Sequence, residues 1–487
     1  MNKNELCKLV SCATESLPDF ECSAVTEDSR RVQPGSVFVA VAGEHADGHV
    51  YVDDATQRGA AAILGNKRDL RELHGVPYIF CEDPRQAAGL LAHALAGNPS
   101  RDMTVIGITG TNGKSSTAYL TQRVLMEAGF SAANFGTMGY HFPGESLPAL
   151  HTTPFGEDLA ALFKRARERN ISHVAMEVSS HALDQERIAG IDFDVAAFTN
   201  LTQDHLDYHK DMGAYRDAKL KLFARIPRDR GFTVVNAADP AAPEFIAASN
   251  ARCYTYGKGG DCKAKRIEQS FGGAQFHLKS PWGKAEVRLN LLGKHNVYNA
   301  LCAATICGGL GIDIDTIARG LGALERVPGR FEAVDAGQDF YVVVDYAHTE
   351  DGLLNVLKAA RKLCRGRIIA VFGCGGDRDK GKRPKMGAVA ATHSDFAIVT
   401  SDNPRTEDPH RILLDVEMGV QRAGKQKGDG YTVIENRAEA IRTAIKMAKR
   451  GDLVMIAGKG HEDYQILGTT RIHFDDRETA RNILNER

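Results

Sequence analysis

The chain has 487 residues, too many for one hydrophobic core, and this length predicts about three domains. Its 61 basic and 62 acidic side chains give a formal net charge of −1, so no charge excess indicates binding to nucleic acid or an anionic membrane. The ten cysteines form no C-x-x-C pair and no Cys/His cluster at zinc spacing. The N-terminal residues lack the apolar core of a signal peptide, and no apolar run approaches the length of a membrane span. We therefore expect a cytoplasmic protein with reduced thiols and no membrane insertion.

Residues 1–99 form the first predicted unit. Apolar runs typical of strands lie at residues 36–42, 61–64 and 78–81. Residues 85–96 have the apolar period of a helix, and residues 98–100 (NPS) mark a linker. Two polar stretches, 28–30 (DSR) and 43–48 (GEHADG), have the composition of ordinary connections.

The second unit, residues 100–328, opens with a glycine loop between a strand and a helix. Residues 104–108 are largely β-branched, residues 110–115 are GTNGKS, and an apolar-periodic helix follows at 117–128. In this arrangement backbone N–H groups and the helix N-terminus point at one phosphate. Lys114 would reach the terminal phosphates of a nucleotide.

This loop departs from the common form G-x-x-x-x-G-K-[ST], because Gly107 and Gly110 both stand at the wrong distance from Gly113. We predict a variant P-loop in which Ser115 or Ser116 holds Mg²⁺. A tight turn with an incidental lysine is the alternative.

Strands and helices continue to alternate through the second unit, which predicts a doubly wound, mostly parallel sheet. The next strands are expected at residues 173–178, 195–199 and 232–235. Polar groups follow two of them, at 177–181 (EVSSH) and 200–205 (NLTQDH), and should converge with the P-loop at one crevice. Short alternating segments at 253–292 indicate a small antiparallel sheet, helices begin at 296 and 314, and residues 327–329 (VPG) are a hinge candidate.

Three side chains of this unit are candidates for catalysis. Glu177 leaves a strand, where a carboxylate can hold Mg²⁺ or merely cap a helix, and His205 is either a metal ligand or a hydrogen-bonded structural histidine. Lys219 lies on the apolar stripe of a helix at 215–226. A cation there needs a partner, a depressed pKa or a covalent change, unless it snorkels to the surface.

The third unit, residues 329–487, has the clearest α/β pattern. Strands are expected at 341–345, 368–372, 396–400, 431–434 and 453–457, and a helix at 437–449. Three strands end in polar loops at 373–378 (GCGGDR), 401–405 (SDNPR) and 458–462 (GKGHE). Arg405, helped by Arg378, could form a two-pronged hydrogen bond with a substrate carboxylate; a turn with an exposed arginine is the alternative.

Over nearly its whole length the chain resembles the Mur ligases of peptidoglycan precursor synthesis, through the motifs TGTNGKSS, HTTP, MEVSSHALDQERI, NLTQDHLDYH, GKHNVYNAL, VPGRFE, VDYAHT, FGCGGDRDKGKRP, SDNPR and AGKGHEDYQ. The resemblance implies a three-domain α/β fold. It comprises an N-terminal domain for a UDP-linked substrate, a central P-loop ATPase domain and a Rossmann-like C-terminal domain for an amino acid.

The resemblance also implies an ATP-dependent amide-bond ligase that works as a monomer. Residues 402–405 (DNPR) are the family's diaminopimelate signature. The expected reaction therefore adds meso-2,6-diaminopimelate to UDP-N-acetylmuramoyl-L-alanyl-D-glutamate through an acyl phosphate, with closure of the third domain. The alternatives are use of L-lysine, a two-domain folylpolyglutamate synthetase and an inactive ATP-binding scaffold.

Carried onto this sequence, the family's contacts imply four sets of site residues. ATP would be bound by Gly110, Thr111, Asn112, Gly113, Lys114, Ser115, Ser116, Asn296 and Arg330. The UDP-linked substrate would be bound by Ser29, Glu44, His45, Ala46, Thr152, Thr153, Ser179, Gln185 and Arg187. Diaminopimelate would be bound by Arg378, Asp402, Asn403, Pro404, Arg405, Gly458 and Glu462. Mg²⁺ would be held by Ser115, Glu177, His205 and Lys219, the lysine as a carbamate formed with CO₂, and Lys114, Glu177, His205 and Lys219 would serve catalysis.

Overall fold

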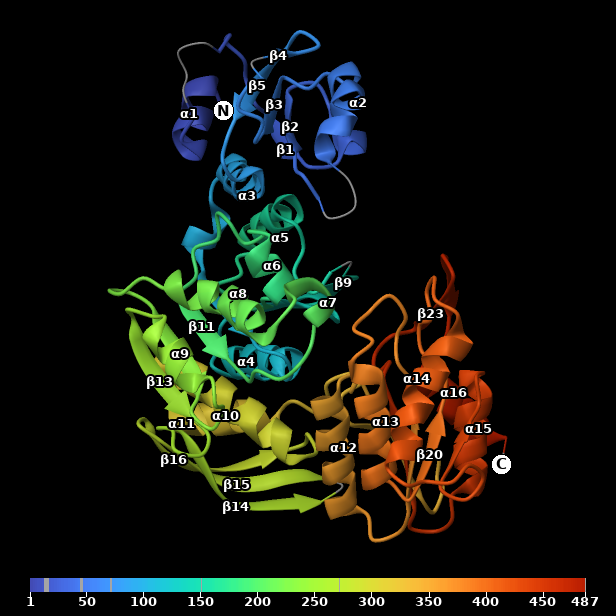
Figure 1. Ribbon diagram of the computed structural model, residues 1–487. Coiled ribbons are helices and arrows are strands. Elements are labelled where there is room, and N and C mark those ends of the chain that lie inside the picture. Colours follow the sequence, from blue (N-terminus) through green and yellow to red (C-terminus); the bar gives the residue numbers. More distant parts are fainter. Residues whose placement is uncertain (13–16, 44–46, 71, 150, 271, 487) are drawn as a thin grey trace.

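The computed structural model describes residues 1–487 except 13–16, 44–46, 71, 150, 271 and 487. Three α/β domains follow one another along the chain, each around its own main sheet (Figure 1). The N-terminal domain lies above the central one, and the C-terminal domain lies to its side. The predicted fold class is therefore confirmed. In the part of the chain that is described, no helix is both long and apolar enough to cross a membrane.

The N-terminal domain is built on a five-stranded sheet of order β1-β2-β3-β5-β4, parallel except at β4. Its strands are β1 (Ala24–Thr26), β2 (Ser36–Ala40), β3 (Ala62–Gly65), β4 (Glu72–Leu73) and β5 (Val76–Phe80). Its helices are α1 (Lys3–Val10), α2 (Val52–Gln57) and α3 (Pro84–Leu95), with 3₁₀ turns η1 (Ser29–Arg31) and η2 (Gly48–Tyr51). The predicted first strand ends two residues early, at Ala40, and the three-residue β1 was not predicted.

The central domain contains an eight-stranded sheet of order β13-β12-β11-β6-β10-β7-β8-β9. The strands are β6 (Thr104–Thr109), β7 (Ala132–Gly136), β8 (Gly139–Phe142), β9 (Glu145–Leu147), β10 (His173–Glu177), β11 (Val195–Phe198), β12 (Phe232–Asn236) and β13 (Arg252–Tyr256). Side chains of β6 alternate between two hydrophobic clusters, since Val105 enters one and Ile106 and Ile108 the other. Helices therefore cover both faces, as the doubly wound prediction requires. The antiparallel extension β7-β8-β9 was not predicted.

The helices of this domain are α4 (Lys114–Glu127), α5 (Gly156–Glu168), α6 (Ser180–Asp184), α7 (Leu206–His209), α8 (Met212–Ala224), α9 (Ala242–Ala247), α10 (Lys294–Gly309) and α11 (Ile314–Gly322). A short 3₁₀ turn, η3 (Pro99–Asp102), precedes β6. The predicted small antiparallel sheet is confirmed as β14 (Lys263–Ser270), β15 (Gly273–Ser280) and β16 (Gly283–Leu289). Helix α4 begins three residues before the predicted start, so Lys114 to Ser116 belong to its first turn.

The C-terminal domain has a six-stranded sheet of order β17-β18-β22-β19-β20-β21 and a β-hairpin. The strands are β17 (Glu332–Ala333), β18 (Tyr341–Asp345), β19 (Ile368–Phe372), β20 (Phe396–Val399), β21 (Tyr431–Val433), β22 (Leu453–Ala457), β23 (Tyr464–Leu467) and β24 (Thr470–His473). The helices are α12 (Glu350–Leu363), α13 (Lys382–His393), α14 (Pro409–Arg422), α15 (Arg437–Met447) and α16 (Asp476–Asn485). All five strands predicted for this unit are present.

Residues at the starts of α12 and α13, and in the loop before α13, contact the P-loop side of the central domain. The Asn112 amide donates to Asp351 Oδ2 at 3.2 Å, and Gln203 Nε2 donates to Asp379 Oδ2 at 3.3 Å. Lys382 Nζ lies 3.9 Å from Asp204 Oδ1. The carboxyl ends of strands from both sheets therefore border one interdomain space.

Candidate functional site

The P-loop has a backbone that only glycine tolerates at two positions. Gly110 has φ +141°, and a Cβ there would stand 1.9 Å from Thr199 Oγ1. Gly113 has φ +87°, and its Cβ would stand 2.4 Å from Asn299 Oδ1. Because the two glycines allow this close approach, the loop curls directly into the N-terminus of α4. This geometry is the one expected of a phosphate-binding loop.

The segment after β11 holds the P-loop in place. Asn200 Oδ1 accepts from the Asn112 N–H at 2.9 Å, and Asn200 Nδ2 donates to Asn112 O at 2.9 Å. The Thr111 hydroxyl donates to Thr202 O at 3.1 Å. β11 and β10 flank β6 in the sheet, so their carboxyl ends meet as predicted.

Two lysines converge on one carbonyl of this loop. Lys114 Nζ donates to Gly110 O and Thr111 O, both at 2.8 Å, and Lys219 Nζ donates to Gly110 O at 3.3 Å. Lys219 is 1% exposed and lies 4.3 Å above the ring of Tyr215, so it does not snorkel to the surface. Burial and then the neighbouring Lys114 hold the pKa of Lys219 well below its usual value.

Glu177 and His205 lie beside the loop. Glu177 is 2% exposed, and its carboxylate accepts from Thr137 through the backbone N–H at 2.9 Å and the hydroxyl at 3.2 Å. Glu177 is not a helix cap, since Ser179 caps α6. Burial, opposed by Asp204, lowers the pKa of His205 to about 3, so this imidazole is neutral at pH 7.

Asn296 and Arg330 contribute to this site in different ways. Arg330 comes from the third predicted unit, and its Nη2 donates to Ser115 Oγ at 3.2 Å. Asn296 is 1% exposed, donates to Leu292 O at 2.8 Å and accepts from Asn299 Nδ2 at 2.9 Å. Its side chain therefore supports the start of α10 and the P-loop neighbour Asn299.

A cavity of about 920 Å³ lies between the N-terminal and central domains. Three of the predicted UDP-substrate residues line it, namely Ser29, Gln185 and Arg187. Thr153 continues this surface inward, because its carbonyl accepts from Arg187 Nη1 at 3.1 Å and its hydroxyl donates to Glu177 O at 2.9 Å. A connected row of polar groups thus runs from the cavity to the P-loop side.

The remaining residues of this set fall into two groups. The Ser179 N–H donates to Thr153 Oγ1 at 3.0 Å, and the hydroxyls of Thr152 and Thr137 are 3.0 Å apart. Both contacts belong to the same polar row. Glu44, His45 and Ala46 lie outside the described residues.

The residues predicted to bind diaminopimelate lie in the loops after β19, β20 and β22. They form a third cluster of candidate site residues, in addition to the P-loop site and the interdomain cavity. Asp402 and Asn403 are 7% and 3% exposed, and Asn403 Nδ2 donates to Glu462 Oε2 at 2.9 Å. A Cβ on Gly458, which has φ +120°, would stand 2.6 Å from Asp402 Oδ2, so a glycine is required beside this carboxylate. The buried Pro404 follows in the same turn.

Two arginines face this cluster. Arg405 Nη1 donates to Gly376 O at 2.8 Å, and Arg378 Nη1 donates to Asp377 O at 2.8 Å. Burial and the nearby Arg378 lower the pKa of Arg405. Arg405 is half-buried and lies within electrostatic reach of the Asp402 and Glu462 carboxylates, whereas Arg378 is exposed.

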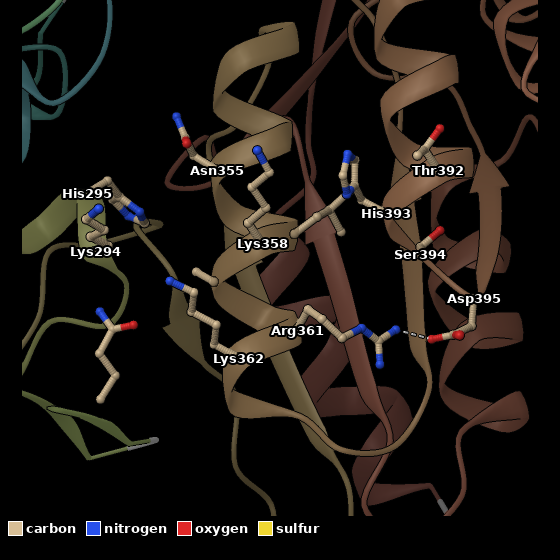
Figure 2. A pocket seen from close by; sticks show the side chains of 13 residues that line it. Lys294, His295, Asn355, Lys358, Arg361, Lys362, Thr392, His393, Ser394 and Asp395 are labelled. Carbon is tan, nitrogen blue, oxygen red and sulfur yellow. Dashed lines mark hydrogen bonds and ion pairs between the residues drawn. The ribbon is translucent and has the colours of Figure 1, made fainter. Parts of the chain in front are cut away.

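A second groove, of about 620 Å³, lies where the start of α10 faces α12 and the end of α13 (Figure 2). Lys294, Lys358 and Lys362 line it, and Arg361 pairs with its carboxylate, Asp395. None of the predicted site residues is among its described lining residues.

Three family models match this chain in the same order as its domains. They are "Mur ligase family, catalytic domain" over residues 21–95, "Mur ligase middle domain" over 108–307 and "Mur ligase, glutamate ligase domain" over 329–460. The chain belongs to the Mur ligase family. The match over residues 21–95 disfavours a two-domain folylpolyglutamate synthetase, which would not need this region.

Curated relatives of this Mur ligase align along nearly its full length. A protein of Syntrophomonas wolfei named UDP-N-acetylmuramoyl-L-alanyl-D-glutamate--2,6-diaminopimelate ligase is 44% identical over 485 residues, 99% of this chain and 98% of the relative. A protein of the same name from Geobacillus kaustophilus is 46% identical over 472 residues, 95% of each chain. A solved structure of that name superposes with a TM-score of 0.69 at 31% identity, covering 99% of this chain and 98% of the other.

Sequence reasoning missed three charged residues of the sites in this Mur ligase. Glu27 and Arg85 line the cavity between the first two domains, and Lys459 lies fully buried in the third cluster. Glu27 directly precedes the DSR stretch and Lys459 lies inside the GKGHE loop, so proximity to a motif was the available signal. No such signal marked Arg85, which lies at the start of a predicted helix.

Glu27 gives this Mur ligase a testable dependence of stability on pH. Burial raises the pKa of Glu27 to about 7, against the opposing charges of Arg85 and Arg187. A carboxyl group whose pKa is higher in the folded than in the unfolded protein makes its full contribution to stability at acid pH. That contribution is lost as the pH rises through the pKa of the folded state. We expect Glu27→Gln to raise the free energy of unfolding at pH 8 by about 2 kcal/mol and to leave it nearly unchanged at pH 5.

Urea unfolding at pH 5 and pH 8 measures this difference. Glu21→Gln, at an exposed position of the same domain, is the matched control and should change neither value. An equal effect of Glu27→Gln at both pH values would contradict the prediction.

Proposed function

We propose that this Mur ligase uses ATP to join meso-2,6-diaminopimelate to UDP-N-acetylmuramoyl-L-alanyl-D-glutamate in peptidoglycan precursor synthesis. The observation that carries the proposal is the position of Arg405, which is half-buried and feels the charges of Arg378 and of the carboxylates Asp402 and Glu462. The far end of diaminopimelate bears one carboxylate and one ammonium group, and this cluster offers a partner for each. L-lysine would leave both arginines without an anion.

The three domains divide the substrates between them in this proposal. Residues 1–99 would hold the UDP-linked substrate, residues 100–328 ATP, and residues 329–487 the amino acid. The ten free cysteines support a reducing cytoplasmic setting, where we propose that the enzyme works as a monomer.

ATP would bind with its phosphates over residues 110–116, at the N-terminus of α4. Lys114 now donates to two loop carbonyls, and a triphosphate would offer its ammonium group stronger acceptors. Ser115 already contacts Arg330 from the third domain, so nucleotide binding and domain contact involve the same side chain.

The donor set beside the loop fits a magnesium nucleotide. Among the described residues, no group of three or more His, Cys, Asp or Glu side chains could hold a metal ion alone. Mg²⁺ commonly takes one or two protein carboxylates and completes its shell with phosphate and water. Glu177, Ser115 and the neutral His205 would hold it here, and it would neutralise phosphate charge.

Lys219 would add a further oxygen ligand as a carbamate. CO₂ reacts with a neutral amine, a new N–C bond forms, and one proton is released to solvent. Burial and the neighbouring Lys114 lower the pKa of Lys219, which increases the share of neutral amine available to CO₂. The product anion would replace an unpaired buried amine beside Lys114, where a negative charge is favoured.

The reaction follows from this placement. The D-glutamyl side-chain carboxylate would attack the γ-phosphorus of ATP and release ADP, giving an acyl phosphate. Lys114 and the loop N–H groups would stabilise charge on the transferring group. An amine of diaminopimelate would then attack the acyl carbon and phosphate would leave, while the contacts of Asn112 and Gln203 with the third domain help exclude water.

Amino-acid selectivity tests the proposed substrate. We expect phosphate release with ATP and the UDP-linked dipeptide to require meso-diaminopimelate, with kcat/KM at least a hundredfold above that for L-lysine. Arg405→Ala should raise the KM for diaminopimelate ten- to a hundredfold, because a charge-assisted hydrogen bond is lost, and should shrink the preference over L-lysine.

Arg411→Ala, at an exposed position of α14, is the matched control and should behave like the wild type. An unchanged KM in Arg405→Ala would remove this arginine from carboxylate binding. Equal turnover with L-lysine would remove diaminopimelate as the specific substrate.

Carbamate formation is tested without an activity assay. With ¹³C-labelled bicarbonate, we expect a lysine carbamate signal in the ¹³C NMR spectrum of the wild type, and loss of that signal in Lys219→Arg. Lys221→Arg, two residues along the same helix, should keep the signal. Its persistence in Lys219→Arg would assign the modification to another amine.

A further inference from the structure

Lys459 is a buried cation to which the proposed reaction gives no role. It follows β22 in the GKGHE loop, and its side chain is 0% exposed. Its Nζ lies 3.0 Å from Glu462 Oε2 and 3.2 Å from Asn403 Oδ1. A lysine so deeply buried requires charged or polar partners, and both partners belong to the cluster proposed for diaminopimelate.

Both ends of the Asn403 side-chain amide form hydrogen bonds inside the protein. Oδ1 accepts from Lys459 Nζ and from the Ile466 N–H, the latter at 3.0 Å, while Nδ2 donates to Glu462 Oε2 at 2.9 Å. Lys459 thereby fixes which end of the amide faces Glu462. Asn403 therefore helps to hold the cluster together.

Two donors converge on the same carboxylate oxygen. Lys459 Nζ and Asn403 Nδ2 both donate to Glu462 Oε2 and neither occupies Oε1, while the Tyr464 hydroxyl is a further hydrogen-bond partner of this carboxylate. An ammonium group is a donor that can bind Oε1. The carboxylate is also held in one rotamer, because both donors come from buried, hydrogen-bonded groups.

Lys459 also balances a second carboxylate. Burial alone would raise the pKa of Asp402, but Lys459 and Arg437 outweigh it and hold that pKa below its usual value. Arg437 is itself committed to Asp476 Oδ2 at 2.7 Å and to Ala457 O at 3.0 Å. Asp402 and Glu462 therefore share Lys459, which also donates directly to Glu462, with the more distant charges of Arg405 and Arg437.

We propose that Lys459 is a positioning residue for amino-acid binding, which fixes Glu462 so that Oε1 receives the far ammonium group of diaminopimelate. The role rests on the proposed function. It predicts that loss of Lys459 weakens binding of the amino acid selectively, because none of the described contacts of Lys459 involves a residue proposed for ATP or the UDP-linked substrate.

Steady-state kinetics of Lys459→Met, which keeps the side-chain length and removes the charge, test the proposal. We expect the KM for diaminopimelate to rise at least tenfold, while the KM for ATP and for the UDP-linked dipeptide stay within twofold and kcat within threefold. Lys446→Met, an exposed lysine on α15 of the same domain, is the matched control and should match the wild type.

A double-mutant cycle separates positioning from general support of the fold. If Lys459 acts through Glu462, Lys459→Met should change the KM for diaminopimelate less than threefold in a Glu462→Gln background. Additive effects in the double variant would overturn the proposal. If Lys459→Met does not fold, Asn403→Ala interrupts the same contact from the other side, and the selective rise in KM is expected there.

The outcomes distinguish this role from the proposed function. A wild-type enzyme that yields no product with diaminopimelate overturns both. A wild type that turns over normally, together with an unchanged KM in Lys459→Met or in Asn403→Ala, overturns the role of Lys459 alone.

Discussion

The central site depends on two ammonium groups that share one carbonyl oxygen. Gly110 O accepts from Lys114 at 2.8 Å and from Lys219 at 3.3 Å. A low-dielectric interior magnifies the repulsion between the two cations, and burial together with Lys114 holds the pKa of Lys219 well below its usual value. Burial also lowers the pKa of Lys114, against the charges of Glu177 and Asp204. The two lysines concentrate positive charge at the loop, where an anion would be stabilised.

The position of this pair follows from sheet topology. β6 lies between β10 and β11, so a glycine loop, a carboxylate and an asparagine all leave the sheet at neighbouring points. The C-terminal domain repeats the arrangement, with polar loops after β19, β20 and β22. Because both parallel sheets turn their carboxyl ends toward the same interdomain space, a phosphoryl donor and an amine can meet there.

The third cluster, proposed to bind diaminopimelate, differs from the P-loop site because charged side chains of both signs lie close together in it. Arg405 and Arg378 stand at the rim, whereas Asp402, Glu462 and Lys459 lie within. Burying an ionic network of this kind costs free energy unless every charged group is paired. A fully paired network holds its side chains in a fixed geometry. In this Mur ligase that geometry presents separate partners for a carboxylate and an ammonium group.

The sequence by itself determined the local features. Glycine spacing and the flanking strand and helix predicted the P-loop, helical period placed Lys219 on a buried face, and strand ends located Glu177 and residues 402–405. These features depend on neighbours within a few residues, so periodicity reveals them. The short β1 and the β7-β9 extension carry too few residues or too weak a β preference for such patterns to show.

Only the tertiary structure decided which distant groups meet. Lys459 and Asn403 are separated by 56 residues, and Arg330 and Ser115 by 215. The cavity that contains Glu27 and Arg85 exists only where two domains meet. Such contacts arise from packing between separate elements, and no local periodicity in the sequence encodes them. The sequence predicted which loops contain the candidate residues, whereas the tertiary fold determined which side chains contact one another.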